Sequence, residues 1–232
     1  MANLNHTDST KQLCVSKVPF FNHLKKDEMV KVVQTSRSLR FTKGEIIHHA
    51  DDILNELLIV HKGKVKIYQI FESGKEQLLR ILKPGEFMGE LAIFSEKRLD
   101  SYAEALEQTE ICAIHRKDMT KLMEKHPTIA IKILEQFSKR LDLTEQLVGQ
   151  NNVMDVEART ASLLLQLRKD EGTSTFMLPM SKKDMASYLA TSQETLSRKL
   201  TKFQENGWIN QKGHRYITVM DDEALVKVAS RT

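Results

Sequence analysis

Short apolar runs separated by turn residues fill the first half of the chain. Three of these runs are rich in Ile, Val and Leu and span 57–60, 65–70 and 77–82. The turns between them contain Gly63 and Gly74. Evenly spaced apolar runs with turn signals are typical of a small antiparallel barrel or jelly roll. We therefore predict a β-rich region over 39–114.

Two shorter segments precede this β-rich region. Apolar residues over 24–37 recur at helical spacing, so a short helix is expected there. Residues 1–17 are polar and aperiodic, which indicates a tail.

The pattern changes to helical periodicity at about Arg116. Pro127 can begin a long helix, because its missing N–H group is harmless in the first turn. Along this helix, seam candidates recur at steps of four and three: Ala130, Leu134, Phe137, Leu141, Thr144 and Val148. Such a heptad repeat is typical of helices that pair in a parallel dimer, although burial against the chain's own β-rich region produces a similar stripe. We predict a dimer seam here and a hinge at 149–152.

Two helical segments joined by a tight turn follow toward the C-terminus. The first is expected over 184–189, with Ser181 as its N-cap. The second is expected over 193–206, with Thr191 or Ser192 as its N-cap. A small β-wing is expected after it. This order of elements favours a winged helix-turn-helix.

The second of these helices has two chemically different faces. Leu196, Leu200 and Phe203 share one side, as core residues do. The other side carries polar residues near the helix N-terminus: Gln193, Glu194, Ser197 and Arg198. In a DNA major groove, arginine can bond to guanine, a carboxylate can accept from cytosine, and serine can serve either role. An ordinary amphipathic helix with a Glu194–Arg198 pair would show the same pattern.

The positive charge of the chain is concentrated in this region. Between Lys182 and Arg215 there are seven basic and three acidic residues, an excess of four that equals the formal net charge of the whole chain, +4. A local basic surface suits phosphate contact, although charge alone does not exclude a solvated helix face. We predict phosphate contacts for four lysines: Lys182, Lys183, Lys199 and Lys202.

Composition excludes several classes of protein. Hydrophobic residues make up 41% and charged residues 28% of the chain. No apolar run approaches the roughly 18 residues of a membrane span, and the N-terminus lacks the features of a signal peptide, so a cytoplasmic protein without a membrane partner is expected. The two cysteines, Cys14 and Cys112, exclude a four-cysteine zinc or iron–sulfur site within one chain. No nucleophile–base set, metal-ligand spacing or P-loop occurs, so neither an enzyme nor a metal site is expected.

Two motifs resemble those of the Crp/Fnr family, which includes the cyclic-AMP receptor protein and the fumarate–nitrate reduction regulator. One motif lies at 63–66 and 83–92, and the other at 185–190 and 192–198. The resemblance covers nearly the full length and implies an α+β fold and a homodimer that binds double-stranded DNA and RNA polymerase. The implied parts are a tail (1–17), a cyclic-nucleotide-binding-type β-roll (18–117), a dimerisation helix and hinge (118–152) and a winged helix-turn-helix (153–232).

The resemblance implies a ligand pocket that has lost its phosphate-binding group. The pocket positions are Gly89, Glu90, Leu91, Ala92, Arg98, Asp100 and Ser101. Members that bind cyclic AMP have an arginine directly before the serine, whereas this chain has Asp100, and a carboxylate repels a phosphate. Arg98 could substitute only with a rearranged loop. We therefore predict no response to cyclic AMP and no cofactor, with the Gly89–Ala92 turn kept as structure.

The cysteines and the reading residues resemble the oxygen-sensing branch of this family, which reads TTGA-type half-sites. In that branch the cysteine that matches Cys112 is an iron–sulfur ligand, and three further ligands lie near the N-terminus, where this chain keeps Cys14. A two-cysteine subgroup of Fnr-like proteins has this arrangement, with a reversible disulfide as its proposed switch. The resemblance thus implies a redox-responsive Cys14–Cys112 pair. The alternative is that Cys112 is a small core residue and Cys14 is incidental.

Two other functions stay open from the sequence. The chain could be a member of the same family that responds to a cyclic nucleotide or another small ligand. It could also be a ligand-binding module without a DNA function, although the helix at 193–206 argues against this. A DNA-binding assay titrated with salt separates the DNA-binding hypotheses from the others, because phosphate contacts weaken steeply as salt rises.

Overall fold

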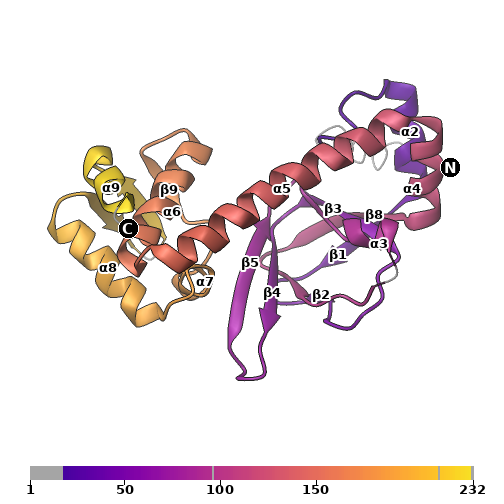
Figure 1. The fold of residues 1–232 in the computed structure, drawn as a ribbon. Helices are drawn as coiled ribbons and strands as arrows, with labels where there is room; N and C mark the ends of the chain where they lie inside the picture. The colour runs from indigo at the N-terminus through magenta and orange to yellow at the C-terminus, as the bar shows by residue number, and fades with distance from the viewer. Residues whose placement is uncertain (1–17, 96, 214, 231–232) are drawn as a thin grey trace. The chain divides into compact units, whose positions relative to one another are not determined.

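The computed structural model describes residues 18–95, 97–213 and 215–230. The chain divides into two compact units (Figure 1). The first unit comprises Met1–Lys75 and Leu79–Lys139, and the second comprises Glu76–Leu78 and Arg140–Thr232.

Two four-stranded sheets form the β-rich part of the first unit (Figure 1). The first sheet has the order β1 (Ser36–Phe41), β8 (Thr109–His115), β3 (Glu56–Lys62) and β6 (Phe87–Met88). The second has the order β2 (Ile46–His48), β7 (Tyr102–Ala105), β4 (Val65–Ile70) and β5 (Glu76–Leu82). The three predicted apolar runs are therefore strands, and the predicted β-roll is confirmed.

Alternation along β3 assigns its side chains to two different cores. Leu58 and Val60 belong to a cluster with residues of both sheets, such as Ile67 of β4. Leu57 and Ile59 belong to a second cluster that also holds residues from helices. Because successive side chains of a strand point to opposite faces, one strand packs against the facing sheet and against the helical layer at once.

Over residues 18–153, the described helices are α2 (Lys26–Thr35), α3 (Glu90–Phe94), α4 (Arg116–Lys125) and α5 (Pro127–Val153). The predicted helix over 24–37 is shorter, because strand β1 already begins at Ser36. Helix α5 continues through 149–152, so the hinge predicted there is wrong. The chain leaves the helix at Met154, and Asp155 then caps the next helix by accepting from the backbone N–H of Ala158 at 2.7 Å.

The second unit contains the predicted winged helix-turn-helix (Figure 1). Its elements are α6 (Val156–Glu171), β9 (Thr175–Met177), α7 (Lys182–Tyr188), α8 (Gln193–Glu205), β10 (Ile209–Lys212), β11 (Tyr216–Val219) and α9 (Asp222–Ala229). The wing is a three-stranded sheet in the order β10-β11-β9. Strand β9 was missed from the sequence, because its three residues carry no clear alternation without the β11 partner.

Candidate nucleic-acid interface and sensor site

Helix α8 is fixed in the second unit by its N-cap and its apolar face. The Ser192 hydroxyl accepts from the backbone N–H of Thr195 at 3.1 Å, so Ser192 rather than Thr191 is the cap. Leu196, Leu200 and Phe203 are fully buried, as predicted. This face holds the helix on the unit and turns its other side outward.

The predicted base-reading side chains lie on the outward side of α8. Gln193, Glu194 and Arg198 are exposed, and Ser197 is half-buried. The Arg198 guanidinium lies 3.8 Å from the Glu194 carboxylate, with 70% and 81% of the two side chains exposed. An ion pair this exposed contributes little to stability, so the guanidinium can exchange this partner for a base at small cost.

Lys199 and Lys202, two of the predicted phosphate contacts, instead meet a buried carboxylate. The Lys199 ammonium donates to Glu157 of α6 at 2.7 Å, and the Lys202 ammonium donates to both Glu157 oxygens at 2.9 Å. Burial raises the pKa of the Glu157 carboxyl, but the hydrogen bonds and charges of the two lysines outweigh this, so its pKa is lowered. Glu157 was missed from the sequence, because it lies 42 and 45 residues from its partners.

The other two predicted phosphate contacts differ from each other. The Lys182 ammonium donates to the side-chain oxygen of Gln211 on strand β10 at 2.8 Å. Lys183 is exposed, and its side chain extends from the first turn of α7. The structure thus places Lys183 at the surface while Lys182 ties α7 to the wing.

The sensor motif of the first unit forms a tight turn into α3. Gly89 has a left-handed φ of +79°, and a Cβ atom there would lie 2.4 Å from the carbonyl oxygen of Glu56. Only glycine therefore fits, which supports the predicted structural role of the turn. Leu91 is exposed, and the side chain of Ala92 lies outside the described residues.

Glu90 follows this glycine and is buried beside Arg80 of β5. The Arg80 guanidinium lies 3.4 Å from a Glu90 carboxylate oxygen. Burial lowers the pKa of Arg80, and the charge of Glu86 acts in the opposite direction. The motif therefore has an arginine from its own unit beside the buried acid.

The predicted phosphate-binding position carries no arginine. Asp100 is exposed, and Ser101 beside it is buried. The Arg98 guanidinium donates to the backbone oxygen of Asp51 at 2.8 Å, so this candidate substitute is bonded to a neighbouring loop. In this conformation neither residue offers a cation at the Asp100 position.

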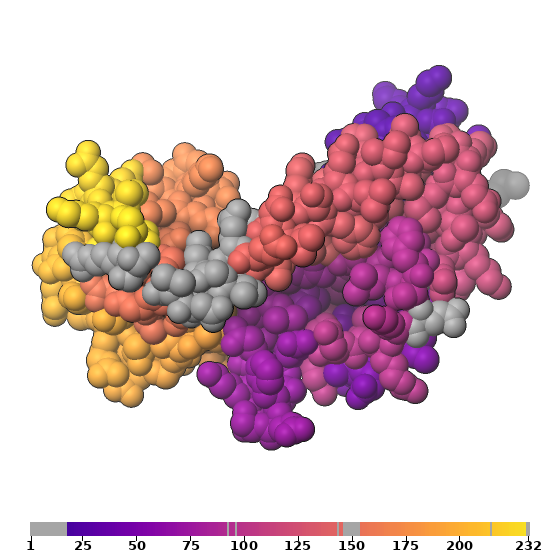
Figure 2. Space-filling view, viewed as in Figure 1, coloured from indigo at the N-terminus to yellow at the C-terminus, as the bar shows by residue number. Residues whose placement is uncertain are grey.

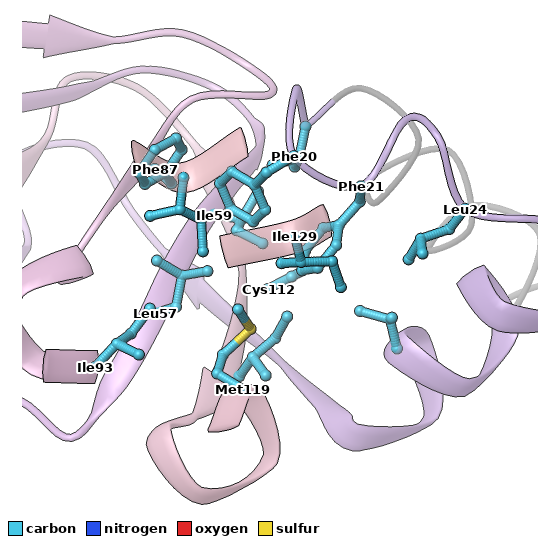
Figure 3. Close-up of a cluster of buried hydrophobic side chains, with 14 of the residues drawn as sticks. Phe20, Phe21, Leu24, Leu57, Ile59, Phe87, Ile93, Cys112, Met119 and Ile129 are labelled. Carbon is cyan, nitrogen blue, oxygen red and sulfur yellow. The ribbon is translucent and has the colours of Figure 1, made fainter. Parts of the chain in front are cut away.

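Cys112 lies in the helical-layer core of the first unit. It is 3% exposed on β8 and belongs to one cluster with Phe20, Phe21 and Ile129 (Figure 3). Cys14, its predicted redox partner, lies outside the described residues. Phe21, which follows Cys14 by seven residues in the sequence, packs in the same cluster as Cys112.

The residues of the predicted dimer seam fall into two groups on α5. Leu134 and Leu141 are 63% and 59% exposed, and Thr144 is exposed. Figure 2 shows α5 at the surface along the first unit. The partly buried Phe137 instead packs against its own core, in the same i, i+4 row as the buried Ile129 and Ile133.

The remaining seam positions add little to this division. Ala130 is half-buried, and the side chain of Val148 lies outside the described residues.

Within the described part of the chain, no helix has the length and apolarity to cross a membrane. Among the same residues, no three His, Cys, Asp or Glu side chains are grouped to hold a metal ion.

Comparisons with known proteins identify both units. Residues 38–126 match the cyclic nucleotide-binding domain family, and residues 158–228 match the Crp-like helix-turn-helix domain family. The chain is 30% identical over 212 residues to the "Probable transcriptional regulator flp" of Lacticaseibacillus casei, covering 91% of this chain and 96% of the relative. It is 29% identical over 230 residues to the fumarate and nitrate reduction regulatory protein of Escherichia coli K12, covering 97% and 89%.

A solved structure shares the fold of most of the chain. FixK2 from Bradyrhizobium japonicum superposes with a TM-score of 0.75 at 22% identity, covering 85% of this chain and 98% of that one. At this identity the similarity shows the fold alone.

Proposed function

Because the chain belongs to the Crp/Fnr family of transcription regulators, we propose that it acts as a homodimer that reads a palindrome of TTGA-like half-sites. Helix α8 enters the major groove, with half-site centres roughly 34 Å apart. The observation that carries the proposal is the outward face of α8, where Gln193, Glu194 and Arg198 stay exposed over a buried apolar face.

The dimer part of the proposal rests on α5. Helix α5 buries Ile129 and Ile133 in its own core but exposes two leucines of one heptad row, Leu134 and Leu141. A second copy of α5 would cover them. Two-fold symmetry then presents two copies of α8 to two half-sites, as a palindrome requires.

A gel-shift titration with three duplexes tests this proposal. The first carries two TTGA-type half-sites, the second carries one, and the third has both scrambled. We expect two chains per palindromic duplex, weaker binding to the single half-site, and a steep loss of affinity with rising salt. Equal affinity for the palindrome and the scrambled duplex contradicts the proposed reading function.

The proposed regulation is a reversible Cys14–Cys112 disulfide that changes DNA affinity. Support comes from the cluster that holds Cys112, because Phe20 and Phe21 pack there and lie only a few residues after Cys14. Six extended residues span about 20 Å, so Cys14 can reach the strand that holds Cys112. Since Cys112 is buried, the bond requires the covering segment to move, which couples oxidation to the core beside α5.

Free-thiol counting by mass spectrometry tests this switch. Under mild oxidant, the parent protein is expected to lose two thiols and to change its DNA affinity. Cys14→Ser should keep one thiol and respond to neither oxidant nor reductant. A Cys14→Ser variant that responds like the parent assigns Cys112 to core packing alone.

The proposed partners are double-stranded DNA, a second copy of the chain and RNA polymerase, and no cofactor is proposed. The absence of cyclic-AMP control is supported by the exposed Asp100 and by the engagement of Arg98 with Asp51. A cyclic phosphate at this position would face a carboxylate rather than a guanidinium.

A further inference from the structure

A buried acid in the second unit binds two lysines of the reading helix. Glu157 is the second residue of α6, and the Asp155 cap fixes the turn from which it projects. Its side chain is 7% exposed, whereas those of Lys199 and Lys202 are 29% and 51% exposed. Three hydrogen bonds of 2.7–2.9 Å join the two ammonium groups to its carboxylate.

Two lysines on one carboxylate fix the orientation of α8. Lys199 and Lys202 are three residues apart and therefore share one side of the helix. Their common anchor on α6 resists rotation of α8 about its axis. Arg198 is next to Lys199 in sequence, so this anchor also sets the direction in which the Arg198 side chain leaves the helix.

The same cluster changes the charge that α8 offers to DNA. Two free lysines would present two positive charges to the phosphate backbone, whereas the cluster with Glu157 has a formal charge of one. A buried, doubly bonded carboxylate is also costly to leave without partners. Moving both lysines to phosphates would leave Glu157 in that state.

We propose that Glu157 is a positioning residue that holds Lys199 and Lys202 away from the phosphate backbone and thereby favours base reading over non-specific attraction. This inference rests on the proposed DNA-reading function of α8. It replaces the sequence-based expectation that Lys199 and Lys202 are phosphate contacts. Under that expectation the two lysines would leave Glu157 when DNA binds.

The salt dependence of DNA binding distinguishes these two arrangements. The slope of log affinity against log salt is about −0.9 for each phosphate that the protein neutralises. If Glu157 keeps the lysines, Lys199→Gln and Lys202→Gln leave the slope unchanged. If the lysines contact phosphates, each substitution flattens the slope by about 0.9.

Glu157→Gln gives the complementary measurement on the full-length dimer. We expect the released lysines to steepen the slope by about 0.9 to 1.8 and to reduce several-fold the ratio of affinities for palindromic and scrambled duplex. Glu223→Gln, on the exposed side of α9, removes the same charge without touching α8 and should leave both quantities unchanged. Adding Lys199→Gln to Glu157→Gln should reverse part of this steepening of the slope.

An unchanged slope in Glu157→Gln, or a flattened slope in either lysine variant, overturns the proposal. The lysine variants decide the question even if Glu157→Gln does not fold, because they leave the carboxylate in place. Failure of the reading function is recognised separately, since the parent protein would then bind palindromic and scrambled duplexes equally. The slopes can still be compared on any duplex in that case.

Discussion

Among the described residues, each unit buries one glutamate beside basic side chains, and the two sites are built differently. In the first unit, Glu90 lies in the sensor motif with the Arg80 guanidinium at 3.4 Å. In the second, Glu157 accepts three hydrogen bonds of 2.7–2.9 Å from two lysines of the reading helix. The first acid, at the start of α3, meets an arginine of strand β5. The second is bonded to the helix that we propose reads DNA.

This difference indicates how the two units have kept their family patterns. The sensor unit has the glycine of the turn and the buried acid, and Asp100 stands at the position where we predict that the cation for a cyclic phosphate is missing. The DNA-binding unit keeps both its buried face and its outward polar face on α8. The comparison therefore predicts large effects at the reading helix and its dimer partner, and none from a cyclic nucleotide.

The largest expected effect is loss of the dimer. Leu134→Glu combined with Leu141→Glu places like charges on the proposed seam and should convert the dimer to a monomer in analytical ultracentrifugation. Palindromic binding should fall to the level of one half-site. Lys139→Glu introduces the same side chain at an exposed residue of α5 that faces away from the heptad row, and serves as the control. A double variant that stays dimeric places the interface elsewhere.

Arg198→Ala should next reduce base discrimination by about 1–3 kcal/mol at one guanine of each half-site. The reason is the loss of a two-bond contact to the base edge. Competition titrations with single-base variants of the palindrome measure this loss. Lys183 is an exposed cation of α7, and Lys183→Ala should instead weaken binding to all sequences alike and flatten the salt slope. If Arg198→Ala weakens scrambled duplex as much as palindrome, Arg198 contacts phosphate only.

Glu157→Gln should lower the stability of the second unit by about 1–3 kcal/mol at neutral pH, because charge-assisted hydrogen bonds are lost. The only tryptophan, Trp208, lies in this unit and reports its unfolding by fluorescence. Since the folded pKa of Glu157 is lowered, its contribution is complete above the ordinary value of 4.5 and is lost as pH falls through the folded pKa. The parent and the variant should converge in this acid range, and a constant difference would contradict the assignment.

A smaller pH effect is expected in the first unit, at a higher pH. His48 is 6% exposed, and burial lowers its pKa below the ordinary value of 6.5. Its contribution to stability is therefore complete above pH 6.5 and is lost as pH falls through the folded pKa, because the unfolded chain takes up the proton first. The protection factors of the β2 and β7 amides against hydrogen exchange should fall as pH falls through this range, and His48→Gln should abolish this fall. The control is His61→Gln, which should leave the pH dependence of amide protection unchanged.

The smallest expected effect is the response to cyclic AMP, which should be zero. Calorimetry and DNA-binding titrations with and without the nucleotide test this expectation. Asp100→Arg, which restores the family residue, is the matched variant and should increase any residual binding. Micromolar binding of cyclic AMP by the parent protein would contradict the prediction that the sensor unit has lost its phosphate-binding group.

Local patterns in the sequence predicted several elements and the two faces of one helix. Apolar runs and turn residues located three strands of the β-roll, β3, β4 and β5, since both signals are properties of consecutive residues. The 3.6-residue period likewise divided α8 into its buried face and its outward polar face. Ser181 was identified as a cap, and Ser192 as one of two candidates for a cap, because a cap bonds to a backbone group only three residues away.

The tertiary structure alone decided which distant groups meet. It paired Lys199 and Lys202 with Glu157, and it joined β9 to the wing through β11. It also turned Phe137 toward its own core while Leu134 stayed exposed, although both belong to the same heptad pattern. A sequence pattern fixes the side of a helix on which a residue lies, but the packing of other elements fixes what that side contacts.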